Sequence, residues 1–539
     1  MLRLLSVLLL SAPAAMAADR PNIVVIMADD LGYGGVSCYG ATAIATPHID
    51  ALATSGLRFT DGYCSASTCT PTRYSLLTGE YAFRRENTGI APPSGPAIIP
   101  AGTTTVASLL QDAGYRTAVI GKWHLGLGDP GPDWNGELSP GPLDVGFDEC
   151  LLLPTTNDRV PQVYLRNRRI ENLDPGDPLW VGKTKPSPDH PTGKTHRDTL
   201  KMDWTHGHND TIHNGISRIG FYTGGQAARF RDEDLADRWV SESVAFIERQ
   251  AASGQPFFLL FASHDIHVPR FPHERFQQQS ALGLRGDSIL QLDWCVGELT
   301  AALDRLQLRD NTLVVFCSDN GPVMDDGYAD GALQQLGNHD ANGPYRGGKY
   351  SVYEGGCRTP FITNWPGTIA PGESDELVCT LDLAASLATI GGTAAGVQEC
   401  IDSFDVSEAL LGRGQSTRRS LILQGNRPKD TMSYRNGRWK LHLHYKEKAR
   451  NVTIAQPLET TPEPRWALYD LSTDPEERTN LAKDNLTLLN YLMADVQEIQ
   501  TNFRQPDGSP TWSQSVRGLV PPRMAAQKAE FNNRTPPKE

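Results

Sequence analysis

Residues 22–30 read NIVVIMADD, an unbroken apolar run that ends in two adjacent aspartates. A short apolar run rich in β-branched residues is typical of a strand that is buried on both faces of a parallel sheet. Similar runs occur at residues 117–120, 257–262 and 313–317. Longer segments with helical spacing of apolar residues lie between them, at 103–113 and 232–250. The chain therefore predicts an α/β fold, a large mostly parallel sheet flanked by helices.

The chain of 539 residues is too long for one ordinary domain. Beyond about residue 413 the pattern changes to short strands and turns, with a hairpin expected over 433–445 and a strand over 466–471. We predict a catalytic domain over residues 18–412 and a smaller C-terminal α+β domain with an antiparallel sheet over 413–539. The last stretch, rich in Pro, Gln, Lys and Asn, has the composition of a mobile tail.

The first residues have the composition of a secretory signal peptide. One early charge, Arg3, is followed by an apolar run at 4–10 and by small residues that end at Ala17. The run is too short to span a bilayer, and no cysteine follows it that could take a lipid. We expect residues 1–17 to be removed and the mature protein to be exported, periplasmic or secreted, without a membrane span.

Composition excludes some classes of function. A formal net charge of −13 disfavours a nucleic-acid-binding protein, because affinity for phosphate backbones comes from clustered Lys and Arg. An anionic ligand would therefore need a local basic pocket. The nine cysteines match no compact disulfide framework. The sequence leaves open whether the eight other than Cys69 form disulfides or stay buried as small apolar residues.

Polar side chains follow each predicted strand. The carboxyl ends of parallel strands meet at one edge of a sheet, where ligands bind in open α/β folds. The residues that follow the four predicted strands include Asp29 and Asp30, Lys122 and His124, His264 and His267, and Asp319 and Asn320. Three carboxylates and an amide suit a hard cation such as calcium or magnesium. Either acidic pair alone is weak evidence, because Asp after a strand is often a turn former or a helix cap.

One cysteine lies at the expected start of a helix, in Cys69-Thr70-Pro71-Thr72-Arg73. Proline favours the first turn of a helix, where free N–H groups and the positive end of the dipole attract anions. Arg73 can add a permanent, forked positive charge one turn later. The residues alone leave two interpretations open, a reactive cysteine at an anion site or an inert buried one.

The same segment, followed by Thr78-Gly79, resembles the modification motif of the sulfatase family, Cys-x-Pro-x-Arg, which usually has Ser where this chain has Thr72. Other blocks that resemble the family, in the same order, are residues 21–30, 121–126, 318–322, 347–349, 354–360, 435–440 and 468–471. The resemblance covers nearly the whole mature chain. It implies a formylglycine-dependent, arylsulfatase-like enzyme with an alkaline-phosphatase-like fold.

In the family the cysteine is oxidised to formylglycine by a formylglycine-generating enzyme, and the resemblance implies this for Cys69. An aldehyde hydrate has one hydroxyl to attack sulfur and a second whose proton can then be removed, so that sulfate leaves by elimination. The implied ligands of one calcium ion, with magnesium a weaker fit, are Asp29, Asp30, residue 69, Asp319 and Asn320. The other implied catalytic residues are Arg73, Lys122 and Lys349 around the sulfate, His124 at the hydrate, and His267 at the leaving oxygen, with His264 as its substitute.

The leading hypothesis is hydrolysis of a sulfate ester, with a sulfated carbohydrate as the expected substrate. One alternative is a phosphate mono- or diester hydrolase of the same superfamily, which would usually bring a Ser or Thr nucleophile and more His ligands for two transition metals. Another is a non-catalytic protein that binds sulfated glycans, although every expected catalytic position is filled. Residues 155–231 predict long loops, which either cover the site or pack elsewhere.

Overall fold

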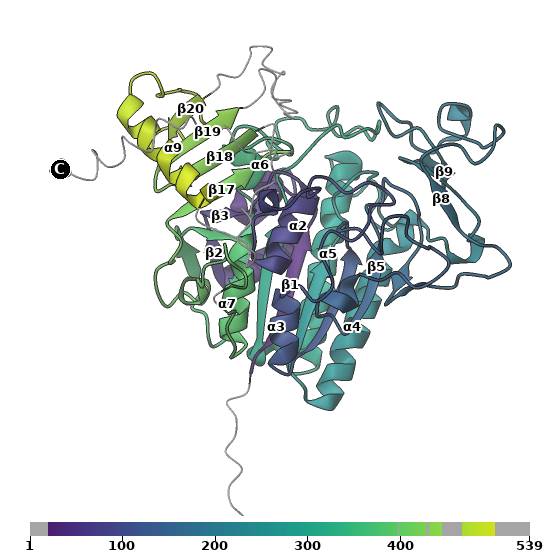
Figure 1. Ribbon diagram of the computed structural model, residues 1–539, viewed down its shortest axis with the longest axis horizontal. Helices are drawn as coiled ribbons and strands as arrows, with labels where there is room; N and C mark the ends of the chain where they lie inside the picture. The colour runs from purple at the N-terminus through teal and green to yellow at the C-terminus, as the bar shows by residue number, and fades with distance from the viewer. Residues whose placement is uncertain (1–19, 397, 427–430, 445–465, 502–539) are drawn as a thin grey trace, which may run out of the picture.

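The computed structural model describes residues 20–396, 398–426, 431–444 and 466–501, and the expected signal peptide and C-terminal tail lie outside these residues. A sheet of ten strands runs through the molecule (Figure 1). In sheet order its strands are β15 (Gly372–Ser374), β2 (Leu57–Phe59), β14 (Phe361–Asn364), β13 (Thr312–Ser318), β1 (Asn22–Ala28), β12 (Phe257–Ala262), β4 (Arg116–Lys122), β5 (Glu149–Leu153), β6 (Leu165–Arg166) and β7 (Arg169–Ile170).

The middle of this sheet is parallel. Strands β13, β1, β12, β4 and β5 pair in parallel with their neighbours. The flanks are different, because β14 runs antiparallel to β13 and β6 runs antiparallel to β5. The four apolar runs that the sequence marked as strands are β1, β4, β12 and β13, so the mostly parallel sheet is confirmed.

Helices cover both faces of the sheet. One face carries α2 (Cys69–Thr78), α3 (Val106–Asp112) and α7 (Leu383–Ile390), and the other carries α1 (Pro47–Thr54), α4 (Leu235–Ser253) and α5 (Gly283–Arg305). The side chains of strand β1 point alternately to the two faces of the sheet, so the strand packs against both helix layers. Its residues 23, 25 and 27 pack with the first set, and residues 24, 26 and 28 with the second. A strand buried on both sides needs an unbroken apolar run, which explains the sequence of β1.

Two helices start later than their sequence pattern predicted. The segment 103–113 forms α3, which starts after a capping box between Thr105 and Ser108. The segment 232–250 forms α4, which follows a 3-10 turn at Asp232–Asp234 and ends before Gly254, whose φ is +69°. Caps and tight turns at the ends therefore set the bounds, while apolar spacing set the centres.

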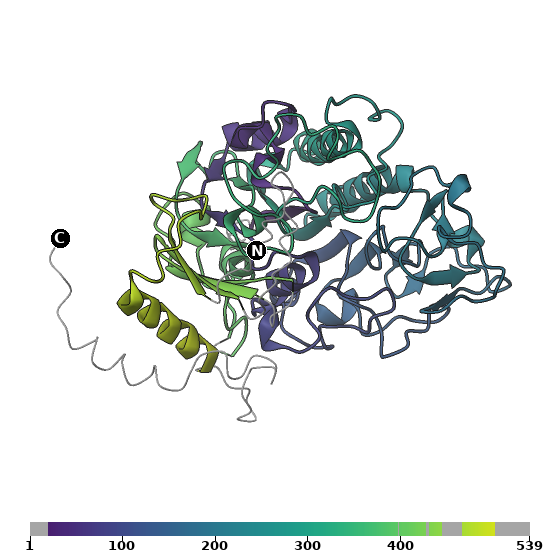
Figure 2. The same cartoon turned by 90° about the horizontal axis from the view of Figure 1, so that it is seen from above.

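A second, antiparallel sheet of four strands follows near the C-terminus. Its order is β17 (Ser420–Gln424), β18 (Thr431–Asn436), β19 (Trp439–His444) and β20 (Trp466–Asp470), and α9 (Leu486–Thr501) packs on it. The predicted hairpin is β18 and β19. The predicted domain boundary near residue 413 falls between α8 (Ser407–Leu410) and β17. Figures 1 and 2 place this sheet and residues 155–231 at opposite ends of the molecule.

The remaining elements are short. They are β3 (Gly62–Tyr63) with β16 (Val378–Cys379), β8 (Trp180–Gly182) with β11 (Phe221–Thr223), β9 (Ile212–His213) with β10 (Ile216–Ser217), and α6 (Glu354–Cys357). All nine cysteines are free thiols, and all except Cys38 are buried. Of the two possibilities left open for the cysteines, the structure has the buried thiols. No helix among the described residues is long and apolar enough to cross a bilayer.

Candidate active site

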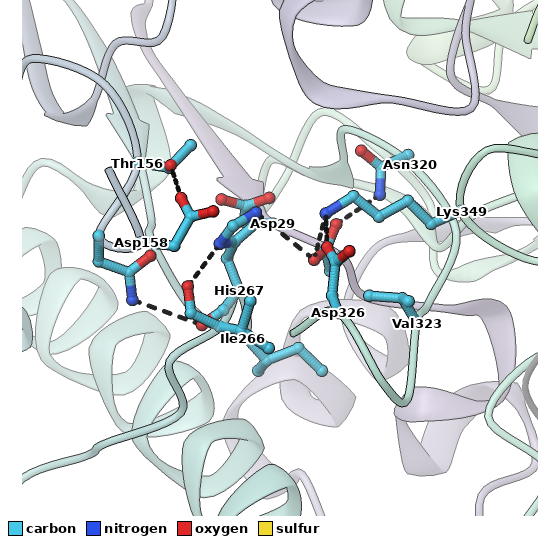
Figure 3. Close-up of polar contacts among 12 residues, drawn as sticks. Asp29, Thr156, Asp158, Ile266, His267, Asn320, Val323, Asp326 and Lys349 are labelled. Carbon is cyan, nitrogen blue, oxygen red and sulfur yellow. Dashed lines mark hydrogen bonds and ion pairs between the residues drawn. The ribbon is translucent and has the colours of Figure 1, made fainter. Parts of the chain in front are cut away.

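The predicted strand tails meet at one edge of the sheet. Strands β13, β1, β12 and β4 are consecutive neighbours, so the residues that follow them are brought together. One carboxylate oxygen from each of Asp29, Asp30 and Asp319 lies within 4.8 Å of the others, and all three side chains are fully buried. We call these three residues the aspartate cluster. Figure 3 shows Asp29 beside His267, with Asn320, Lys349 and Asp326 close by.

The aspartate cluster and Asn320 have oxygen atoms that could coordinate a metal ion. Nδ2 of Asn320 donates to Oδ1 of Asp30 at 2.7 Å. Oδ1 of Asp29 and Oδ1 of Asn320 are buried and have no hydrogen-bond partner. Burial, and then repulsion from Asp319, raises the pKa of Asp29 to about 8, and burial also raises the pKa of Asp30. A hard cation would relieve the repulsion and use the unpartnered oxygens, so these residues fit a metal such as calcium.

Three basic side chains surround the aspartate cluster. Lys122 makes a close ion pair with Asp29. Arg73 donates from Nε to Oδ2 of Asp319 at 2.9 Å and from Nη1 to the carbonyl of Lys122 at 3.1 Å. Nζ of Lys349 lies 2.8 Å from Oδ2 of Asp30. The structure thus brings Arg73, Lys122 and Lys349, which the sequence assigned to the sulfate, together around the aspartate cluster.

Cys69 is the first residue of α2 and is buried. Its Sγ, a carboxylate oxygen of Asp29 and a ring nitrogen of His267 all lie within 4.8 Å of one another. Burial raises the pKa of the Cys69 thiol. Thr72, which stands where the family usually has Ser, uses its hydroxyl to donate to the carbonyl of Ala66 at 3.0 Å and to accept from its N–H at 3.2 Å. The hydroxyl common to Ser and Thr therefore fixes the chain just before the helix.

The two histidines nearest these groups are held as neutral rings. Nδ1 of His267 lies 2.7 Å from the carbonyl of Val268 and must donate to it, which leaves Nε2 without a proton, 4.0 Å from Oδ2 of Asp30. Nε2 of His124 donates to the carbonyl of Ala91 at 3.2 Å, and its buried Nδ1 has no partner. Burial, with the charge of Lys349 at His267 and of Lys122 at His124, lowers both pKa values well below the usual range. Each ring thus offers one nitrogen that can accept a proton.

His264 lies differently. Its Nδ1 accepts a hydrogen bond from the indole N–H of Trp239 on α4 at 3.2 Å, and its Nε2 is 3.7 Å from Asp265. Both contacts belong to the scaffold behind the site. Of the two histidines that follow β12, His267 is therefore the one that faces Asp30.

Four charged or polar residues at the site were not singled out from the sequence. Asp326 is 2.9 Å from Nζ of Lys349. Asp158 accepts hydrogen bonds from Nε2 of His208 at 2.9 Å and from Nη1 of Arg159 at 3.0 Å. Despite its burial, the charge of Arg159 holds the pKa of Asp158 well below its usual range. In Figure 3 Asp158 lies on one side of His267, and Asp326 and Lys349 lie on the other.

Weak sequence signals existed for some of these residues. Asp326 belongs to a second pair of adjacent aspartates, Asp325-Asp326, after the tail of β13, and His208 ends the run His206-Gly207-His208. Asp158 and Arg159 have no such pattern. Because Asp158, Arg159 and His208 come from residues 155–231, at least part of that segment lies at the site rather than elsewhere.

The family model Sulfatase matches residues 21–393, a range that contains all of these side chains. The chain belongs to the sulfatase family. It is an enzyme that hydrolyses sulfate esters, as the resemblance of its sequence blocks implied.

Relatives of this sulfatase cover almost the whole chain. It is 44% identical to N-acetylgalactosamine-6-O-sulfatase of Bacteroides thetaiotaomicron over 485 residues, which are 90% of this chain and 94% of that protein. It is 34% identical to human arylsulfatase A over 527 residues, 95% of this chain and 94% of that one.

Solved structures agree on the fold. A Bacteroides thetaiotaomicron sulfatase structure, described under the metabolism of multiple glycosaminoglycans, has a TM-score of 0.83 and 43% identity and covers 89% of this chain and 99% of its own. The phosphonate monoester hydrolase of Agrobacterium radiobacter has a TM-score of 0.56 at 18% identity, covering 89% of this chain and 95% of its own. That second likeness concerns the fold alone, which is the alkaline-phosphatase-like fold implied by the sequence. The fold is thus shared by enzymes with different substrates, and the site must decide the chemistry.

Proposed function

We propose that this sulfatase removes a 6-sulfate from N-acetylgalactosamine or a close relative of that sugar in a sulfated glycosaminoglycan, using a formylglycine made from Cys69 and one calcium ion. The observation that carries the chemistry is the position of Cys69 at the start of α2, beside the buried carboxylate of Asp29, which has an unpartnered oxygen. The substrate is supported by the relative that is 44% identical over 90% of the chain. We also propose export before or during maturation, with a formylglycine-generating enzyme as the partner that converts Cys69.

Calcium would be held by Asp29, Asp30, residue 69, Asp319 and Asn320. Buried carboxylate and amide oxygens suit calcium better than magnesium, because magnesium usually retains several waters. When bound, the ion would neutralise sulfate oxygens and lower the pKa of the nucleophile. Around it, Arg73 and Lys122 keep fixed positive charge aimed at the same position, which costs no reorganisation during the reaction.

The aldehyde at position 69 would supply, as its hydrate, the hydroxyl that attacks sulfur. The start of α2 favours this role because its free N–H groups and dipole stabilise negative charge. The unprotonated Nδ1 of His124 is suited to take a proton from the hydrate. This assignment explains why that nitrogen is buried without a partner.

The leaving oxygen needs a proton or a positive charge beside it. Although burial favours the neutral amine, the charges of Asp30 and Asp326 hold the pKa of Lys349 well above its usual value, so Lys349 stays protonated. We assign Lys349 to this oxygen as the proton donor, and His267 to a position beside it, where its unprotonated Nε2 can accept a hydrogen bond from the released hydroxyl. Asp326 then acts by keeping Lys349 charged.

The sugar would lie on the side of His267 that carries Asp158, Arg159 and His208. A carboxylate, a guanidinium and an imidazole offer the donors and acceptors that fix sugar hydroxyls. The three are already joined by hydrogen bonds at 2.9 and 3.0 Å, so the surface is preorganised.

The sequence leaves two alternative functions open. The phosphoester hydrolase is disfavoured by the donor set, which is rich in carboxylate and amide oxygens and suits one hard cation. The non-catalytic glycan-binding protein gains no support, because each expected position is filled and the relatives are enzymes by name.

The test is a parallel assay of released sulfate and phosphate. Protein from a host with the maturing enzyme is given N-acetylgalactosamine 6-sulfate, its 4-sulfate isomer and an aryl phosphate, with Cys69→Ala as the matched control. We expect the 6-sulfate to be preferred over the 4-sulfate by at least about tenfold in kcat/KM, and Cys69→Ala to be inactive. Faster release of phosphate than of sulfate would overturn the proposed chemistry, and preference for the 4-sulfate would overturn the proposed substrate alone.

A further inference from the structure

A buried arginine in α5 has no hydrogen-bond partner. Arg285 is 1% exposed, and its Nε, Nη1 and Nη2 are all buried without a partner. Burial, and then the charge of Arg270, lowers the pKa of Arg285 to about 9. An uncompensated charge in a protein interior costs several kcal/mol, so this guanidinium calls for a counter-charge.

The neighbouring carboxylate is already used. Nη1 of Arg270 lies 2.5 Å from Oδ2 of Asp330, so this pair is neutral as a whole. Asp30, whose charge also acts on Arg285, is held by Lys349 at 2.8 Å. Two guanidinium groups and one carboxylate leave one positive charge at Arg285.

The charge of Arg285 acts on a second buried group without a partner, His339. His339 is buried, its Nε2 has no partner, and burial together with the charge of Arg285 lowers its pKa to about 4. The ring is therefore neutral near pH 7, and Nε2 can carry a proton and donate it. Nearby Met324, Ala332 and Ala341 form a small apolar cluster, which favours a weakly hydrated ligand over a strongly hydrated one.

We propose that Arg285 and Nε2 of His339 bind a small monovalent anion of the halide class, with chloride as the physiological occupant. One negative charge balances the surplus charge of the group, and the N–H groups on four nitrogen atoms, three of Arg285 and Nε2 of His339, can donate to it. Neither residue is among those assigned to the sulfate or the cation, and the proposal does not depend on the proposed substrate.

Arg270, whose charge acts on Arg285, holds the loops that carry active-site residues. Arg270 donates to the carbonyls of Ile266 at 3.1 Å, Val323 at 2.6 Å and Met324 at 3.1 Å. In the sequence Ile266 directly precedes His267, and Val323 and Met324 precede Asp326. Figure 3 shows Ile266 next to His267 and Val323 next to Asp326. A bound anion would offset the repulsion between Arg285 and Arg270, and Arg270 holds these loops by its hydrogen bonds.

The direct test is a crystal of the wild-type protein grown in bromide, examined by anomalous scattering. We expect a bromide peak beside Arg285. The second readout is the Tm in chloride against gluconate at a constant ionic strength of about 0.15 M. Chloride should raise the Tm of the wild type by about 2–4 °C.

Variants isolate the site. In Arg285→Met the chloride-specific rise in Tm should vanish, whereas Arg305→Met should keep it, because Arg305 is an exposed residue of the same helix paired with Glu248 at 2.8 Å. Absence of the bromide peak would overturn the proposal, and so would a Tm of the wild type that is equal in chloride and gluconate. A peak without the Tm effect would mean binding at crystal concentration only and would also overturn it. None of these readouts uses sulfate release, so failure here leaves the proposed function untouched.

Discussion

Two buried charge clusters in this sulfatase have opposite character. The aspartate cluster holds carboxylates close together and leaves Oδ1 of Asp29, like Oδ1 of the adjacent Asn320, without a partner. The second cluster, which we call the Glu354 network, consists of Glu354, Lys440, His442 and Glu477. Nζ of Lys440 lies 2.7 Å from Glu354 and 3.1 Å from Glu477, and Nε2 of His442 is 2.7 Å from Glu477.

The contrast appears in the carboxylates. Although burial favours the neutral acid, the charge of Lys440 lowers the pKa of Glu354 to about 2, whereas burial and repulsion raise the pKa of Asp29 to about 8. Burial raises the pKa of Glu477 to about 7, so the contrast in pKa holds for Glu354 and not for both carboxylates of the network. Glu354 and Asp29 are both fully buried, so burial does not distinguish them. In the Glu354 network both glutamates are paired with Lys440, Glu477 is also paired with His442, and these contacts join α6 to β19. The aspartate cluster and the adjacent Asn320 each have one unpartnered oxygen, which indicates a ligand.

The largest expected effect comes from removing a cation ligand. We expect Asp29→Asn to lower sulfate release at least about a thousandfold, because the site loses charge that would hold the metal. In chelator the variant should be at least as stable as the wild type, since one of three repelling carboxylates is gone. Sulfate release and Tm in EDTA measure the two quantities. A variant with normal activity would remove Asp29 from the proposed metal site.

The matching change in the Glu354 network should affect stability and not chemistry. Lys440→Met leaves two carboxylates without their shared cation, and we expect a loss of about 3–5 kcal/mol in the free energy of unfolding. Turnover per folded molecule should stay unchanged. Lys201→Met, at a half-exposed lysine 3.8 Å from Glu233, is the control and should cost less than about 1 kcal/mol. A Lys440→Met protein of normal stability would show that the network is not structural.

Calcium and pH should act together on the aspartate cluster. Without metal, the folded-state pKa of Asp29 is about 8 against an ordinary 3.8, so the native state binds the extra proton and stability falls as pH rises between these values. Calcium displaces that proton, so stabilisation by calcium should grow with pH and reach about 3 kcal/mol at a hundredfold excess over Kd. Tm with calcium and with EDTA at pH 5 and pH 8 gives the difference. A larger calcium effect at pH 5 would contradict the account.

The smallest expected effect is at His264. Because its ring contacts Trp239 and Asp265, His264→Gln should change kcat less than about tenfold. His267→Gln should cost about 10²–10⁴-fold, the usual range for a group that handles a proton. Equal losses in the two variants would mean that the two histidines cannot be separated by their orientation in the fold.

Much of the sheet was predictable because its central strands are buried on both faces and therefore read as apolar runs. Strands such as β14 and β6 were missed because they are short and lie where the sheet turns antiparallel. Helix centres followed from apolar spacing, but helix ends depended on local caps such as Thr105.

The site was predictable where residues follow a strand directly. Asp29, Lys122 and Asp319 needed only the rule that parallel strand ends converge. Asp158 and His208 come from long loops, whose path is set by tertiary contacts that no local pattern encodes. His264 and His267 follow the same strand, and only the packing of Trp239 on α4 shows which of them turns away.

The central claim is that residue 69 carries an aldehyde beside a cation site. Mass analysis of the peptide that spans residue 69, in active protein from a host with the maturing enzyme, tests it most directly. We expect the mass of formylglycine in place of cysteine, and reaction of that peptide with a carbonyl reagent. An intact thiol at residue 69 in protein that releases sulfate at the full rate would contradict the account.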